Sequence, residues 1–318
     1  MKSKIPLNIF VCLLYYTCSS QSLSTHYLGG GANNACSFFI TDMKMSNKGS
    51  CYFTGGYYLD AQIDTFIMSA PIGYGNFFLS KISGGHINYL KYDLNFYENH
   101  SNCMAIDDSS NIYIGGRYYG DIILGNDTLP AGPFAIGLFI AKYDSAANLK
   151  WAKTFYTGSG NINDIAVTSQ GDIYAGGYFG GTLKFDNDSL TSTSNYQEAF
   201  ICKFNNSGNY QWAIEGHGIL QNKFVDAVAA DTAGNVYIAG YFTNSITFGS
   251  VTINSTVLNN PIGYLVKLSP SGTVLFYKKL ESFTFMGNAV VPSDIEVVTF
   301  APGQRRLGWW FATRLPAR

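Results

Sequence analysis

SCYFTGGYY (residues 50–58), NIYIGGRYY (111–119), DIYAGGYFG (172–180) and NVYIAGYFT (235–243) are four stretches of this chain that share one pattern. Each has a tyrosine at its third position and a glycine three residues later. The tyrosines Tyr52, Tyr113, Tyr174 and Tyr237 follow one another at intervals of 61, 61 and 63 residues. A fixed period of this length indicates a repeat architecture in which each repeat is one supersecondary unit.

A second set of residues repeats with nearly the same period. Lys81, Lys142, Lys203 and Lys267 are 61, 61 and 64 residues apart, and nine residues beyond them lie Leu90, Trp151, Trp212 and Phe276. Two independent anchors that agree on one period exclude coincidence. The sequence therefore divides into repeats at about 28–91, 92–153, 154–215 and 216–280, within a repeat region at 25–280.

Each repeat contains four strand signals. In the third repeat, DIAV from Asp164 and DIYAGGYF from Asp172 flank the turn SQGD, and AFICKF from Ala199 and YQWAI from Tyr210 flank NNSGN. Gly and Asn tolerate the backbone angles of tight hairpins. The sequence predicts an all-β fold, a β-propeller of four-stranded antiparallel blades of about 61 residues. Four complete repeats and a partial fifth leave open whether the ring closes.

Some repeated positions have a structural explanation. The glycines Gly55, Gly116, Gly177 and Gly240 predict a close backbone approach in the second strand of each blade. Trp151 and Trp212 are interpreted as structural repeat positions. A further hairpin is expected between the second and third strands, as in GTLKFDNDSL from Gly181. It could decorate the blade edge or form a ligand-facing loop.

The fourth repeat carries a family resemblance. GNVYIAGYFTNSITFGSVTI (234–253) and GYLVKLSPSGTVLFYKKL (263–280) resemble the SBBP-type bacterial β-propeller repeat of exported and cell-surface proteins. The resemblance covers roughly residues 28–280. Two positions depart from it: Leu90 replaces tryptophan in the first repeat, and the pair of a small and an acidic residue that often precedes the third strand is matched only approximately by Gln197 and Glu198. The resemblance implies a propeller scaffold and export, and no common enzymatic activity.

The two ends of the chain differ from the repeats. Residues 1–24 have lysines followed by an apolar run of about 12 residues, which predicts a cleavable signal peptide and a secreted or cell-surface protein. Lipid attachment at Cys18 is the alternative. Residues 281–303 begin a fifth repeat, and residues 304–318 hold four of the five arginines and no lysine. This tail is interpreted as a frameshift or truncation product, or as a genuine cap. A missing C-terminal region could attach the protein to the outer surface.

Nothing in the sequence requires catalysis, a cofactor or a metal. The four histidines lack ligand spacing, DND at Asp186 lacks the further oxygen ligands of a calcium loop, and no CxxC pair exists. Cys36, Cys51, Cys103 and Cys202 occupy unequal repeat positions, which favours free thiols over disulfides. No later segment reaches the length of a transmembrane span.

The remaining function classes are a binding scaffold and an exported enzyme. Residues 25–303 carry 14 basic and 21 acidic side chains, so a basic footprint for nucleic acid is missing. We expect a protein or glycan ligand, and the candidate contacts are Tyr57, Tyr58, Tyr118, Tyr119, Tyr178 and Tyr241. Packing between blades is the alternative role of these tyrosines. A carbohydrate-active hydrolase or lyase that uses the propeller funnel is the alternative function, and it requires carboxylates clustered around the axis.

Overall fold

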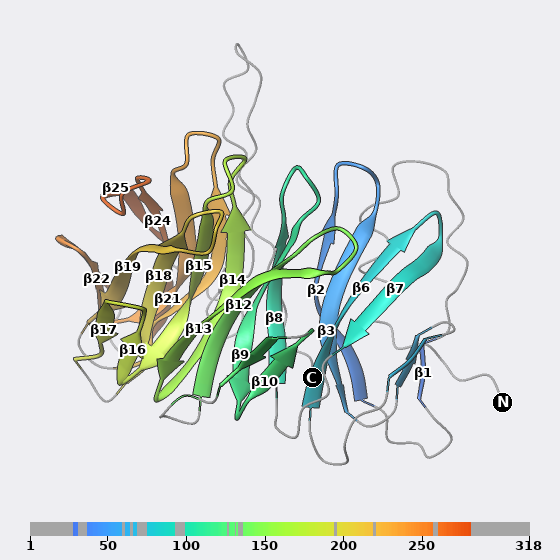
Figure 1. Ribbon diagram of the computed structural model, residues 1–318. Coiled ribbons are helices and arrows are strands. Elements are labelled where there is room, and N and C mark those ends of the chain that lie inside the picture. The colour runs from blue at the N-terminus through green and yellow to red at the C-terminus, as the bar shows by residue number, and fades with distance from the viewer. Residues whose placement is uncertain are drawn as a thin grey trace, which may run out of the picture.

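The computed structural model describes residues 28–30, 37–58, 61–63, 66–68, 75–92, 99–125, 127–130, 132, 136–193, 196–218, 221–256 and 260–280. All regular structure in these residues is β-strand. The strands build four successive antiparallel blades, which follow one another from the blue to the orange part of the ribbon in Figure 1. The β-propeller fold that the repeats predict is confirmed. The predicted signal peptide and the residues after 280 lie outside the described part.

Each blade is a meander of four strands, in the order in which they occur along the chain. Blade 1 contains β2 (Ser37–Met45), β3 (Cys51–Tyr58), β6 (Gly75–Ser83) and β7 (His86–Tyr92). Blade 2 contains β8 (Asn99–Ile106), β9 (Ile112–Tyr119), β12 (Ile136–Tyr143) and β13 (Leu149–Thr157). Blade 3 contains β14 (Ser159–Val167), β15 (Ile173–Gly180), β18 (Glu198–Phe204) and β19 (Tyr210–His217). Blade 4 contains β20 (Phe224–Ala230), β21 (Val236–Thr243), β24 (Pro261–Leu268) and β25 (Val274–Leu280).

The hairpin expected between the second and third strands is present in every repeat. The four hairpins are β4 (Ala61–Ile63) with β5 (Phe66–Met68), β10 (Ile122–Leu124) with β11 (Asp127–Leu129), β16 (Thr182–Lys184) with β17 (Ser189–Thr191), and β22 (Ser245–Phe248) with β23 (Val251–Asn254). β16 pairs with β13 of the preceding blade, and β22 pairs with β19 of the preceding blade. β1 (Leu28–Gly30) pairs with β4. In repeats 3 and 4 the hairpin therefore extends the edge of the neighbouring blade.

The two sequence anchors are partners across neighbouring strands. Tyr174 of β15 lies opposite Lys203 of β18, and the lysine Nζ lies 5.5 Å from the centre of the tyrosine ring. The same register and the same cation-π contact recur in the other blades, in the pairs Tyr52 with Lys81, Tyr113 with Lys142, and Tyr237 with Lys267. Such contacts between a cation and an aromatic face are attractive. This pairing explains why tyrosine and lysine repeat with one period.

The repeated glycine is required by the strand beside it. An alanine Cβ at Gly177 would lie 1.9 Å from the carbonyl oxygen of Asn161 on the neighbouring inner strand β14. The corresponding distance is 2.0 Å at Gly55, 1.9 Å at Gly116 and 2.0 Å at Gly240. A β-bulge in each inner strand, between Ile162 and Asp164 in β14, brings this carbonyl close. The close approach expected from the sequence is therefore present, and its cause is the bulge.

Consecutive blades pack through their inner strands. β2 lies on β8, β8 on β14, and β14 on β20. The apolar core fills the spaces between blades: one cluster joins Phe155 and Ile140 of blade 2 to Phe200 and Ile173 of blade 3. Within the described residues, no packing of this extent joins blade 4 to blade 1. The four blades therefore form an open series (Figure 1).

The predicted structural tryptophans join one blade to the next at the outer side. Trp151 Nε1 donates a hydrogen bond of 3.2 Å to the carbonyl of Asn206 in blade 3. Trp212 Nε1 donates one of 3.0 Å to the carbonyl of Pro270 in blade 4. Each ring covers the turn glycine of the following blade, Gly208 or Gly272. Both tryptophans thus belong to one recurring contact between blades.

Cys103 and Cys202 are free thiols, as the sequence favours. Cys103 and Cys202 are buried and Cys51 is partly buried, whereas Cys36 lies outside the described residues. Burial raises the pKa of the Cys103 and Cys202 thiols. Both sulfurs approach a backbone carbonyl of the adjacent strand, that of Gly115 or Ala175. They therefore pack as small apolar side chains that are protonated at neutral pH.

Candidate functional site

The inner-strand bulges place one side chain per blade at equivalent positions. These bulge residues are Thr41, Asn102, Asn163 and Asp226. Thr41 Oγ1 donates to the carbonyl of Ser101, and Asn163 Nδ2 donates to the carbonyl of Val225, with lengths of 2.8 and 2.9 Å. Each of these bonds reaches the inner strand of the next blade. The bulges therefore aim polar side chains along the inner surface of the series.

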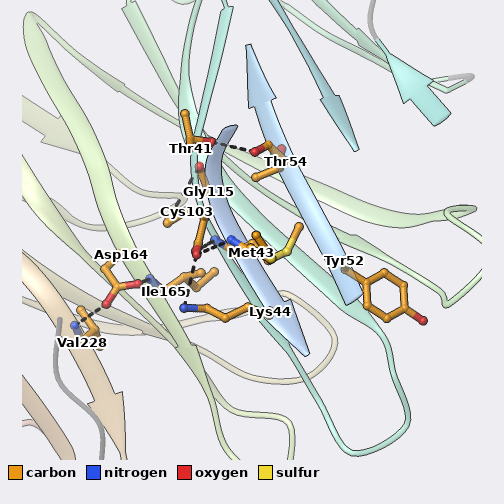
Figure 2. A network of polar contacts seen from close by, with 12 residues as sticks. Thr41, Met43, Lys44, Tyr52, Thr54, Cys103, Gly115, Asp164, Ile165 and Val228 are labelled. Atoms are coloured by element: carbon orange, nitrogen blue, oxygen red, sulfur yellow. Dashed lines mark hydrogen bonds and ion pairs between the residues drawn. The ribbon is translucent and has the colours of Figure 1, made fainter. Parts of the chain in front are cut away.

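The residue after the bulge fixes neighbouring blades together in two of the four repeats. Asp164 accepts a 2.8 Å hydrogen bond from the backbone N–H of Ile165 and a 2.6 Å bond from that of Val228 in blade 4 (Figure 2). Asp42 does the same with Met43 and with Met104 of blade 2, at 2.7 and 2.8 Å. Bonds from backbone N–H groups to a carboxylate are charge-assisted and strong. These carboxylates join blade 1 to blade 2 and blade 3 to blade 4.

Burial changes the acidity of both carboxyl groups. It raises the pKa of Asp164 to about 7, although the positive charge of Lys44 and the N–H of Val228 act in the opposite direction. It also raises the pKa of Asp42, against the lowering effects of Lys44 and the backbone N–H groups. Lys44 Nζ lies 3.5 Å from Asp42 Oδ1. Asp42, Lys44 and Asp164 thus interact electrostatically across the inner strands of blades 1 and 3.

Blades 3 and 4 also share an aromatic cluster. Phe224, at the start of β20, lies between two tyrosines: its ring is stacked on Tyr241 at 4.8 Å and meets Tyr178 edge-on at 4.9 Å. All three rings are partly buried. The described residues give the hydroxyl groups of Tyr178 and Tyr241 no hydrogen-bond partner. The cluster therefore offers both aromatic surface and polar groups.

A shallow surface cavity of about 290 Å³, largely open to solvent, lies beside this cluster. Its walls consist of Tyr196, Gln221, Asn222, Phe224, Tyr241, Thr243 and Pro261. The wall formed by residues 221–223 is fixed to Gln197, which directly precedes β18: Gln197 N–H donates to Asn222 Oδ1, and Lys223 N–H donates to the Gln197 carbonyl, each at 3.0 Å. The cavity thus has an apolar side, an amide side and a fixed wall.

Asp226 acts electrostatically on the aromatic cluster. Burial raises the pKa of Tyr241 to about 12, and the charges of Asp226 and Tyr178 add to this effect. Burial raises the pKa of Asp226 itself to about 7. Its Oδ1 accepts a long 3.4 Å bond from Asn163, while its buried Oδ2 has no hydrogen-bond partner in the described structure. At neutral pH the Tyr241 hydroxyl is therefore protonated and able to donate.

No family model matches this chain. Its sequence is similar to that of an uncharacterized WD repeat-containing protein, L264, of Acanthamoeba polyphaga mimivirus: 31% of 162 residues are identical, which covers 45% of this chain and 11% of that protein. Among solved structures, it is similar to a protein of unknown function from Bacteroides caccae, with a TM-score of 0.33 and 10% identity over 76% of this chain and 82% of the other. This chain thus spans a small part of its viral relative.

The structure separates the six candidate tyrosines into different environments. Tyr178 and Tyr241 occupy the aromatic cluster, and Tyr119 is partly buried elsewhere, near Arg117. Tyr57 and Tyr118 are fully buried in the core, so the expectation that they contact a ligand is wrong. They lie five residues after the repeat tyrosine, whereas Tyr178 and Tyr241 lie four after it, and successive side chains of a strand point to opposite faces. The side chain of Tyr58 lies outside the described residues.

Several residues of the cavity were not among the sequence candidates. These are Tyr196, Gln221, Asn222, Phe224, Thr243 and Pro261. The residues 221 and 222 belong to a connection between repeats, and Tyr196 follows the hairpin β16–β17, so the repeat pattern gives no signal for them. Phe224 lies two residues before the bulge residue Asp226, and the sequence did not show the bulge, so it gave no signal for this side chain either.

The described residues contain no group of three or more His, Cys, Asp or Glu side chains that could hold a metal ion. They also contain no helix long and apolar enough to cross a membrane. Acidic side chains in several hairpin turns accept hydrogen bonds from backbone N–H groups of the same turn. Asp107, for example, accepts them from Ser109 and Asn111 at 3.0 and 2.8 Å. Asp144 and Asp231 repeat this arrangement. These carboxylates stabilise separate hairpin turns, those of Asp107 and Asp144 in blade 2 and that of Asp231 in blade 4.

Proposed function

We propose that this protein is a non-catalytic binding scaffold, exported to the outside of a bacterial cell, which holds a glycan in the cavity beside Phe224 and Tyr241. The observation that carries the proposal is the aromatic cluster at the wall of that cavity. Carbohydrate recognition combines aromatic surface, which packs against the C–H faces of a sugar ring, with polar groups for its hydroxyls. The Tyr241 hydroxyl and the side chains of Gln221 and Asn222 can supply these polar groups.

The pre-formed shape of the cavity supports binding without large rearrangement. Asn222 is already fixed by the N–H of Gln197, and Lys223 Nζ donates a 2.8 Å bond to the Gln221 carbonyl. Phe224 and Tyr241 are held by stacking on each other. A wall that is ordered before binding lowers the entropic cost of holding a ligand.

The carboxylate arrangement favours binding over hydrolysis. A glycosidase needs two carboxyl groups that face the sugar, separated by about 5 to 10 Å. Asp42 and Asp164 each accept two backbone N–H groups, one of them from the next blade. Their oxygens therefore hold the blades together. An exported glycoside hydrolase would need another carboxylate pair.

Replacement of Tyr241 by alanine tests this proposal. We expect the variant to lose at least about tenfold in affinity for the glycan that the wild-type protein selects on an array, because a central aromatic contact contributes on the order of 2 kcal/mol. Isothermal titration with that glycan gives the affinity. Tyr119→Ala is the matched control, since this partly buried tyrosine lies in blade 2, away from the cavity. An equal loss in both variants, or no glycan bound by the wild type, would overturn the proposal.

Two further measurements define the proposal. A hydrolysis and lyase screen on the selected glycan should show no product, and product that disappears when a carboxylate is replaced would instead support the enzyme.

Export and the SBBP-type relationship rest on the sequence of residues 1–24 and of the repeats. We expect cells that express the full chain to release or display a mature protein that begins near residue 25, which N-terminal sequencing detects. Retention of Met1 in the cytosol would contradict export.

A further inference from the structure

The side chains that line the cavity beside Phe224 are all uncharged. They are three aromatic rings, a proline, two amides and a hydroxyl, contributed by Tyr196, Phe224, Tyr241, Pro261, Gln221, Asn222 and Thr243. Residues 194–195, 219–220 and 257–259 lie outside the described part of the chain, just before these segments in the sequence, and they carry no charged side chain either. A carboxylate, sulfate or phosphate on a ligand would therefore meet no cation on this wall.

The charged groups behind the wall also disfavour an anionic ligand. Lys223 is fully buried, so its ammonium group cannot touch a ligand in the cavity. Its Nζ donates a 2.8 Å bond to the Gln221 carbonyl, and the negative charge of Glu198 stabilises its positive charge. Asp226, when ionised, adds a negative charge that acts on Tyr241. The electrostatic surroundings of the cavity therefore favour a neutral ligand.

The side-chain amide of Asn222 has one orientation. Its Oδ1 accepts the 3.0 Å bond from the backbone N–H of Gln197, and a reversed amide would place two donors against each other. The nitrogen Nδ2 has two N–H donors and no acceptor. Asn222 is exposed on the cavity wall, and none of the described residues accepts a hydrogen bond from its Nδ2. The wall therefore presents a fixed donor group that requires an acceptor on the ligand.

The backbone beside this donor is held in place as well. Gln221 has φ of +64°, in the left-handed region that residues with a side chain rarely adopt. The Lys223 N–H bond to the Gln197 carbonyl and the Lys223 Nζ bond to the Gln221 carbonyl hold this conformation. Strained backbone persists only where its surroundings fix it, and it clusters at ligand-binding sites. The donor of Asn222 is therefore positioned before a ligand arrives.

The rings of Tyr196, Phe224 and Tyr241 give the cavity an apolar side close to this donor. A sugar hydroxyl both donates and accepts hydrogen bonds, and it has no apolar part. An acetamido group combines a carbonyl oxygen, which only accepts, with a methyl group, which is apolar. A fixed N–H donor next to aromatic rings matches both parts of that group.

We propose that this cavity selects neutral sugars that carry an N-acetyl group, with the acetamido carbonyl at Asn222 Nδ2 and the methyl group against the rings of Phe224 and Tyr241. This inference rests on the proposed glycan-binding function and adds the chemical class of the sugar. Because the cavity is shallow and open to solvent, one sugar unit occupies it while the rest of the glycan extends outward. A site that hydrogen-bonds one group of a ligand discriminates against the analogue that lacks this group.

Matched pairs of sugars that differ only at C2 test this inference. N-acetylglucosamine and glucose form β-1,4-linked tetramers of equal length, and the methyl glycosides of N-acetylgalactosamine and galactose differ in the same group. We expect isothermal titration of the full chain to show that the acetylated member of at least one pair binds at least about tenfold more tightly. Equal binding of both members, or array hits without an acetamido group, would overturn the inference and leave the glycan-binding scaffold intact. Binding of no glycan at all would refute the proposed function itself.

Asn222→Asp isolates the contribution of the donor. Aspartate has nearly the same shape and keeps an oxygen for the Gln197 N–H, but it has no N–H group. We expect its affinity for the acetylated sugar to fall at least about tenfold, with little change for the hydroxyl counterpart. Asn187→Asp, in the exposed turn of the β16–β17 hairpin, makes the same chemical change outside the cavity and is the matched control. Circular dichroism establishes that both variants are folded. An unchanged affinity of Asn222→Asp, or an equal loss for both sugars, would exclude the proposed contact.

Discussion

Replacing Gly177 by alanine should be among the most destabilising single substitutions in this chain. The added Cβ would lie 1.9 Å from the Asn161 carbonyl oxygen, and both atoms belong to hydrogen-bonded strands at the centre of blade 3. Backbone atoms cannot rotate away as a side chain does, so the strands must separate. We expect a loss of more than about 4 kcal/mol in the free energy of unfolding, the range reached only by severe core defects. Urea unfolding followed by circular dichroism, together with the soluble yield, measures it.

Gly181→Ala provides the control for this prediction. Gly181 lies four residues later and has φ of +79°, and nothing lies within 4 Å of a Cβ built there. Its replacement costs only the backbone strain of a left-handed residue, about 1 kcal/mol. If both variants lost the same small amount of unfolding free energy, strands β14 and β15 would be able to separate at little cost. The close approach to the carbonyl would then not explain the repeated glycine.

The repeats predicted the fold because each repeated residue has a fixed partner in the blade. Tyrosine and lysine repeat together since they are opposite each other on adjacent strands, as Tyr174 and Lys203 show. The glycine three residues after the tyrosine is present in all four repeats, whereas the position before it holds Thr54 or Ala239 in two of them. The structure explains this difference: a Cβ clashes with a carbonyl only at the invariant position. Sequence alone did not show the bulge.

The candidate site was less accessible to sequence reasoning. The candidates Tyr178 and Tyr241 do meet around Phe224, but the period alone did not separate their face of the strand from that of Tyr118. The blade-joining carboxylates Asp42 and Asp164 occupy a position that holds Cys103 and Ala227 in the other two repeats. An irregular repeat position carries no statistical signal. The cavity wall comes from connections between repeated strands, which vary in length and composition.

Asp226 gives the clearest pH dependence in this structure. Burial raises its pKa from 3.8 to about 7, so the folded state favours the protonated form. Between about pH 4 and pH 7 the folded chain therefore binds more protons than the unfolded chain. Its contribution to the free energy of unfolding falls as the pH rises through this window and is constant above it. Asp164 acts in the same direction, because burial raises its pKa to about 7 as well.

We expect Asp226→Asn to be more stable than the wild type at pH 8 and to lose part of the pH dependence. The amide keeps an oxygen for Asn163 and removes the buried charge. A shift of about three pKa units corresponds to at most about 4 kcal/mol, and because the residue is only partly buried we expect about 2 kcal/mol at pH 8. At pH 4 the two proteins should be nearly equal. Urea unfolding at both pH values measures the difference, with the exposed turn variant Asp108→Asn as the control. A destabilised Asp226→Asn at pH 8 would instead mean that the charged carboxylate is stabilised by its surroundings.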